Sequence, residues 1–254
     1  MASLKQSFSW WCFDKRGVDA PDLLRAAAGI GYQGVEMLPR EHWEAAGDLG
    51  LRLVSEVGHT ALSDGLNRRE NHQRIRGELL AKLEVAVEWQ IPVLICFSGN
   101  RGGLSDEAGL AHCAELLKEL APQAESAGAA LAVELLNSKV DHLDYQADHT
   151  EWGVQLCEAV DSPSVKLLYD IYHLQIMEGD LIRTIQRHHA HFAHYHTAGN
   201  PGRGIMDETQ EINYPALYRA ITETGYTGYI GHEFIPKGDP VAALCTAFEQ
   251  CAGA

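Results

Sequence analysis

The sequence predicts an α/β fold in which eight strands alternate with helices, a single (β/α)8 TIM barrel over residues 1–254. Two observations support this prediction: short apolar runs alternate with helix-forming stretches, and eight such runs occur within 254 residues. Parallel strands need a long crossover connection, usually a helix, so this alternation indicates a parallel sheet. About 250 residues is the usual length of such a barrel. A doubly wound sheet would have fewer strands and a Gly-rich first turn, which is absent here.

The eight predicted strands are short apolar runs, each ending in polar or turn-forming residues. The clearest one begins with Val165, Leu167, Leu168 and Tyr169 and then meets an acid, Asp170. In chain order the predicted strands are Gln6–Phe13, Gly34–Leu38, Leu51–Val57, Ile91–Ser98, Ala130–Asn137, Val165–Tyr172, His191–Ala198 and Tyr226–Phe234.

The intervals between the strands carry helical patterns. In the long stretch Arg69–Gln90, the apolar residues Ile75, Leu79, Leu83 and Val87 recur every four residues, which places them on one helix face. The interval Pro39–Gly50 is short and predicts only a weak helix. The other predicted helices are Pro21–Gly29, Arg69–Gln90, Asp106–Gly128, His149–Val160, Asp180–His189, Tyr214–Thr224 and Pro240–Cys251.

Composition and charge exclude several classes of protein. Hydrophobic residues make up 46% of the chain, which suffices for a full core and excludes disorder. The formal net charge of −15 opposes nucleic-acid binding, which needs a basic surface. A local arginine or a metal can still hold a small anion. We therefore expect a small-molecule partner, no nucleic acid, no membrane and a possible homo-oligomer.

The cysteines and the N-terminal residues indicate a cytoplasmic protein. The six cysteines form no CxxC pair and mostly fall in apolar patterns, so buried reduced thiols are expected rather than disulfides or zinc ligands. No apolar run approaches the roughly 18 residues of a membrane span. The first six residues, MASLKQ, contain no signal-peptide core.

Four consecutive predicted strands carry an ionisable residue near their carboxyl ends. These residues are Glu134, Asp170, His196 and Glu233. The carboxyl ends of barrel strands converge at one mouth, so the four side chains are expected to meet there. Three carboxylates and one imidazole suit Mg²⁺ or Mn²⁺, with Co²⁺ possible, and leave positions for substrate oxygens. The sequence therefore predicts a divalent-metal site at these residues.

Ion pairing with a basic residue is the alternative explanation for a strand-end acid. On these four predicted strands the only lysine or arginine is Lys166, which lies near the opposite end of its strand. Four such residues together therefore favour the metal. His194 and His232 are interpreted as structural, since His194 falls one layer below His196 and His232 alternates with Glu233.

Other polar residues at strand ends are candidate substrate contacts. Glu36 ends the second strand, His59 follows the third, and His173 lies three residues after Asp170. Arg203 lies in the loop after the seventh strand, where its planar fork could hold a carboxylate or a hydroxyl. Each also has a structural interpretation, as a surface or core polar group.

The loop after the seventh predicted strand is rich in glycine. Gly199–Gly204 reads GNPGRG, but it lacks the GxGxxG spacing between a strand and an immediate helix. A polar loop is therefore preferred to a dinucleotide site.

Trp10 and Trp11 end the first strand; one is expected at the barrel mouth and the other in the core.

Several stretches carry a family resemblance. The most specific are YDIYHLQIMEGD at 169–180, NPGR at 200–203, EINYP at 211–215 and GYTGYIGHEFIP at 225–236. With the strand order, they make the chain resemble the xylose isomerase-like TIM-barrel superfamily, and within it the hydroxypyruvate isomerase family. The resemblance implies a divalent metal at Glu134, Asp170 and Glu233, with the two glutamates also serving proton transfer.

The implied activity is a metal-dependent aldose–ketose isomerisation of a small hydroxy-oxo acid, with hydroxypyruvate and tartronate semialdehyde interconverting through an enediolate. One departure keeps alternatives open: the family's isomerases often have Gln where this chain has His196, and His at that place resembles the ketose 3-epimerases. A sugar isomerase or dehydratase is also possible. An abasic-site endonuclease shares the superfamily fold but needs a larger His-rich zinc cluster and a basic groove. A silent metabolite-binding barrel would not need the carboxylate pair.

Overall fold

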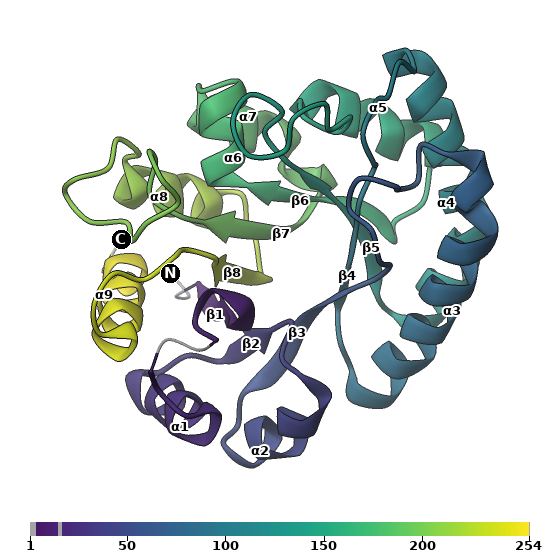
Figure 1. The fold of residues 1–254 in the computed structure, drawn as a ribbon. Coiled ribbons are helices and arrows are strands. Elements are labelled where there is room, and N and C mark those ends of the chain that lie inside the picture. The colour runs from purple at the N-terminus through teal and green to yellow at the C-terminus, as the bar shows by residue number, and fades with distance from the viewer. Residues whose placement is uncertain (1–3, 15–16, 254) are drawn as a thin grey trace. The chain divides into compact units, whose positions relative to one another are not determined.

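The computed structural model describes residues 4–14 and 17–253, and it confirms the predicted fold class. Eight parallel strands follow one another in chain order around a closed barrel (Figure 1). The strands are β1 (Lys5–Ser9), β2 (Gly34–Glu36), β3 (Arg52–Val57), β4 (Val93–Cys96), β5 (Ala130–Leu135), β6 (Val165–Asp170), β7 (Phe192–Thr197) and β8 (Tyr229–His232).

Helices connect the strands as the sequence predicts, and one further helix, α6, lies where the sequence predicts none. They are α1 (Ala20–Ile30), α2 (Trp43–Asp48), α3 (His72–Trp89), α4 (Asp106–Ala127), α5 (Thr150–Val160), α6 (Ile171–Met177), α7 (Leu181–His188), α8 (Tyr214–Glu223) and α9 (Pro240–Ala252). None of the described helices combines the length and the apolarity of a membrane-spanning helix.

Most strands end earlier than predicted. The first predicted strand, Gln6–Phe13, ends at Ser9 because Trp10–Cys12 forms a 3₁₀ turn. The sixth, Val165–Tyr172, ends at Asp170, and the following residues form α6. In both cases apolar residues continue beyond the strand because they are buried in the connecting segment, so the length of an apolar run overestimates the length of the strand.

The chain divides into two compact units, and a prediction of one domain over residues 1–254 stays a prediction. One unit comprises residues 55–179 and 190–194. In it, β4, β5 and β6 pair in parallel, with Glu134 of β5 opposite Leu168 of β6. The long helix α4 begins at a Ser105 cap and ends at Gly128, whose φ of +66° fits glycine. Leu116, Leu117 and Leu120 of α4 are buried.

The other unit comprises residues 1–54, 180–189 and 195–254, apart from those the structure does not describe. In it, β1 lies between β2 and β8, with Ser9 opposite Glu36 and Phe8 opposite His232. Edge-to-face contacts join the ring of Phe8 to the rings of Phe13 and Tyr32. These contacts pack β1 into the core of this unit.

His232 is buried and structural, as predicted. Its Nδ1 lies 2.8 Å from the Thr197 hydroxyl, and its Nε2 lies 2.8 Å from Oε1 of Gln6. The amide oxygen only accepts, so Nε2 carries the proton and the hydroxyl donates to Nδ1. Burial lowers the pKa of His232 to about 3. The imidazole is therefore neutral in the folded protein near neutral pH.

This lowered pKa predicts a loss of stability in acid. An unfolded histidine binds its proton near pH 6.5, so the contribution of His232 is complete above that pH and falls as pH drops towards 3. The free energy of unfolding is expected to fall by about 2 kcal/mol between pH 6.5 and pH 5 on account of this residue. Urea denaturation at several pH values measures this change in the free energy of unfolding. His232→Gln should flatten the dependence, and the exposed His189→Gln should not. Equal pH slopes for wild type and His232→Gln would contradict it.

Candidate active site

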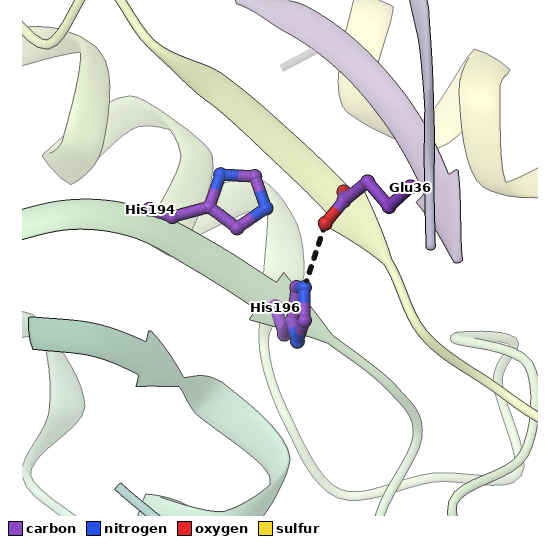
Figure 2. Close-up of side chains that lie close together, drawn as sticks. All are labelled: Glu36, His194 and His196. Carbon is purple, nitrogen blue, oxygen red and sulfur yellow. Dashed lines mark hydrogen bonds and ion pairs between the residues drawn. The ribbon is translucent and has the colours of Figure 1, made fainter. Parts of the chain in front are cut away.

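His196 and Glu233 lie side by side at the ends of β7 and β8. His196 pairs with Gly231 in the parallel ladder, which brings its strand end next to Glu233. Nδ1 of His196 lies 3.0 Å from Oε2 of Glu233, and both side chains are buried. His194 lies two residues earlier on the same strand (Figure 2). An imidazole nitrogen and a carboxylate oxygen thus face each other at one strand end.

Glu36 at the end of β2 contacts the other nitrogen of the same imidazole. Nε2 of His196 lies 3.0 Å from Oε2 of Glu36 (Figure 2). Oε1 of Glu36 accepts a hydrogen bond of 2.6 Å from the hydroxyl of Ser7 on β1. All three side chains are almost fully buried. The contact between Glu36 and a substrate stays a prediction.

Two further side chains hold Glu233. The indole Nε1 of Trp11 donates a 2.8 Å hydrogen bond to Oε1 of Glu233, and Arg203 forms an ion pair with Oε2. Burial by itself raises the pKa of Glu233, but the charges of His196 and Arg203 outweigh it and hold the pKa well below its usual range. Glu233 is therefore a carboxylate. Trp10 is buried, as expected for one of the two tryptophans, and Trp11 is 43% exposed. The place of the other tryptophan at the barrel mouth stays a prediction.

The GNPGRG loop presents Arg203 to this carboxylate. Gly199 and Gly204 exchange two backbone hydrogen bonds of 2.7 and 3.2 Å, which closes the loop as a tight turn. A Cβ at Gly199 would lie 2.5 Å from the carbonyl oxygen of Ile205, so only glycine fits. Arg203 has a φ of +54°, and its guanidinium lies 5.3 Å above the ring of Trp11. The sequence prediction of a polar loop is confirmed.

In the other unit, Glu134 and Asp170 are buried acids on neighbouring strands. Glu134 is 6% exposed and Asp170 is 1% exposed. Oδ1 of Asp170 accepts backbone hydrogen bonds from Tyr172 at 2.9 Å and His173 at 3.2 Å, so Asp170 is the N-cap of α6. This cap fixes the carboxylate at the strand end.

His173 is buried and belongs to a polar network that the sequence did not indicate. Its Nδ1 accepts a 2.6 Å hydrogen bond from the amide of Asn137, and its Nε2 lies 3.6 Å from Oδ2 of Asp170. The same amide donates to Asp141 at 2.6 Å, and the hydroxyl of Tyr172 donates to Asp141 at 2.8 Å. His173 therefore lies beside Asp170, and its contact with a substrate stays a prediction. Only the place of Asn137, at the end of the predicted strand carrying Glu134, could have indicated it.

His59 contacts backbone on both sides. Its Nε2 accepts the N–H of Phe97 at 2.9 Å, so Nδ1 carries the proton and donates to the carbonyl of Thr60 at 3.1 Å. Burial lowers its pKa. These contacts give the ring a structural role after β3, and its contact with a substrate stays a prediction. Arg101 is likewise engaged, in a two-pronged pair with the buried carboxylate of Asp148.

Residues 24–251 match the family described as the xylose isomerase-like TIM barrel. The chain belongs to this family. It is 30% identical to a 2-oxo-tetronate isomerase of Cupriavidus necator over 88% of this chain and 90% of that protein. It is 28% identical to a putative hydroxypyruvate isomerase of Homo sapiens over 96% of this chain and 94% of that protein. The resemblance drawn from the sequence is thereby confirmed.

A solved structure gives a similar fold under another name. The crystal structure of an AP endonuclease, family 2, from Brucella melitensis superposes with a TM-score of 0.84 and 27% identity. The match covers 96% of this chain and 97% of that one. Proteins with this fold are thus named for different activities, and the function has to be inferred from the residues of the site.

Proposed function

We propose that this protein is a metal-dependent isomerase that interconverts the aldose and ketose forms of a small hydroxy-oxo acid. The observation that carries the proposal is the buried set of strand-end carboxylates and imidazole on β5 to β8, in a chain whose relatives are named isomerases. Hydroxypyruvate is the first substrate to test, and 2-oxo-tetronate is the second.

Glu134, Asp170, His196 and Glu233 would hold the metal. All four are buried, and together they have the composition of a metal site. Their donors fit the chemistry: three carboxylates and one imidazole suit Mg²⁺, Mn²⁺ or Co²⁺, and no cysteine is among them. Within one unit, the 3.0 Å approach of His196 Nδ1 to Glu233 Oε2 brings two of these donors together. When bound, the ion would stabilise negative charge that develops on the substrate oxygens.

Glu134 and Glu233 are the proposed proton-transfer residues. The isomerisation removes a proton from one carbon, passes through an enediolate, and adds a proton to the neighbouring carbon, while a hydroxyl proton moves between the two oxygens. A carboxylate can accept the first proton and a carboxylic acid can return it. Glu233 is ionised beside His196 and Arg203, so it is able to accept a proton. Trp11 and Arg203 fix its orientation.

Assays in D₂O with Mn²⁺ test this function. Incubation with hydroxypyruvate and with 2-oxo-tetronate should give the isomerised acid, with deuterium at the carbon that receives the proton. The label appears because the proton on a catalytic carboxyl exchanges with solvent before it is returned. NMR follows both product and label. Inertness towards both acids would reject the proposal.

His196 is the observation that favours a second candidate, a ketose 3-epimerase. An epimerase would label a neutral ketose at its third carbon and leave hydroxypyruvate unchanged, so a ketose panel belongs in the same assay. An oligonucleotide with an abasic site belongs there too. The net charge of −15 opposes binding of this polyanion, so we expect no cleavage.

Arg203→Lys is expected to weaken binding of an acid substrate. The planar guanidinium can hold a carboxylate with two parallel hydrogen bonds, whereas lysine offers a point charge. KM for the acid should rise by on the order of 10-fold, with a smaller change in kcat. Steady-state kinetics measures both. Arg183→Lys, exposed on α7, is the control and should leave KM unchanged. An unchanged KM in Arg203→Lys would remove this residue from carboxylate binding.

A further inference from the structure

Glu36 is a buried carboxylate for which the proposed reaction has no role. It ends β2 with no exposed surface, and it is held from two sides. Ser7 donates a hydrogen bond to one carboxylate oxygen. His196 lies at the other oxygen (Figure 2). A buried carboxylate is costly unless its oxygens are hydrogen-bonded, so a defined purpose for this arrangement is expected.

The contacts of Glu36 define which nitrogen of His196 carries a proton. A carboxylate oxygen only accepts hydrogen bonds, so Oε2 of Glu36 at 3.0 Å requires a proton on Nε2. The opposite nitrogen, Nδ1, is the one that faces Glu233. A metal that binds at Nδ1 would replace any proton there, and the imidazole would then be neutral, with its remaining proton on Nε2. A carboxylate behind an imidazole also raises the basicity of the ligand nitrogen.

We propose that Glu36 is a positioning residue that fixes the tautomer and the ring orientation of His196, so that Nδ1 serves as the metal ligand beside Glu233. Ser7 orients the carboxylate of Glu36 through its hydroxyl. This inference rests on the proposed metal site but not on the identity of the substrate. The proposed role of Glu36 is thus contact with the imidazole of His196, whereas the sequence suggested contact with the substrate.

Mn²⁺ titration of the purified protein without substrate tests the proposal. Three variants are compared by calorimetry: Glu36→Leu, Glu36→Gln and the control Gln6→Leu. Gln6 is a matched control because it is buried on β1 and contacts an imidazole, that of His232, outside the proposed ligand set. Loss of such a supporting carboxylate typically lowers metal affinity by roughly 10- to 100-fold, so we expect this for Glu36→Leu. The Gln6→Leu variant should bind within about twofold of wild type.

Glu36→Gln should have an intermediate Mn²⁺ affinity, and it also serves as the test if Glu36→Leu does not fold. The glutamine amide oxygen can still accept from Nε2 but carries no charge, so affinity should fall by about threefold to 10-fold. If Glu36→Leu does not fold, as judged by circular dichroism, Glu36→Gln decides: an affinity equal to that of wild type overturns the proposal. A folded Glu36→Leu that binds Mn²⁺ as wild type does also overturns it.

The tautomer supplies a readout that a purely structural role would not change. In Mg²⁺-loaded protein with ¹⁵N-labelled histidine, His196 should show a protonated Nε2 and an unprotonated Nδ1. In folded Glu36→Leu at the same Mg²⁺ concentration, where weaker binding leaves part of the protein without the ion, we expect a mixture of tautomers. A single unchanged tautomer would overturn the proposal. Neither measurement uses a substrate. Inertness of wild type towards every acid would therefore reject the isomerase function and leave these results standing.

Discussion

Glu134→Gln and Glu233→Gln are each expected to lower kcat by on the order of 10²-fold or more. Glutamine keeps the size and shape of the side chain, but it neither accepts nor returns a proton near neutral pH. Both positions are buried, and the fold should survive an isosteric change. Kinetics at saturating substrate and saturating Mn²⁺ measures the effect, with circular dichroism as the check on folding.

Both glutamates are also proposed metal ligands, so loss of the metal must be separated from loss of proton transfer. Metal content is measured on the same samples, and kcat is compared only for protein that carries the ion. Glu56→Gln is the matched control, since Glu56 lies on β3 and is paired with Lys82 at 2.9 Å. It should retain kcat. A glutamine variant that binds substrate more weakly but turns over normally would remove that glutamate from proton transfer.

Removing the metal is expected to abolish turnover, and Mn²⁺ or Mg²⁺ should restore it. Without a cation the negative charge that develops on the two substrate oxygens has no compensation in a buried site, and the barrier rises steeply. The experiment is dialysis against EDTA, followed by removal of the chelator and stepwise addition of each ion. Turnover that persists undiminished in metal-free protein would refute the metal requirement.

The fold was predictable because the alternation of an apolar strand pattern with a helical pattern is repeated along the chain. Each strand and helix carries an apolar pattern of its own, and eight repetitions leave little choice of architecture. The boundaries were not predictable from the same pattern. The stretch after Asp170 is apolar enough to continue a strand, yet Asp170 caps a seven-residue helix there, and this cap depends on backbone geometry beyond the strand.

The strand-end acids were predictable for a different reason. An acid that ends an apolar strand stands out in the sequence, because burial of a charge demands a partner. The partners themselves were not predictable. Glu36 and His196 are 160 residues apart, and Trp11 and Glu233 are 222 residues apart, so no local pattern relates them. Asn137 and Asp141 likewise became recognisable only through their contacts with His173 and Tyr172.

Anomalous diffraction from a crystal soaked in Mn²⁺ tests the proposed metal site most directly. A single strong peak is expected, within roughly 2.0–2.6 Å of a carboxylate oxygen from each of Glu134, Asp170 and Glu233 and of an imidazole nitrogen of His196. Soaking with hydroxypyruvate should then add density for the acid beside this peak. Ordered side chains with no peak among them, or a peak bound by other residues, would contradict the proposed site.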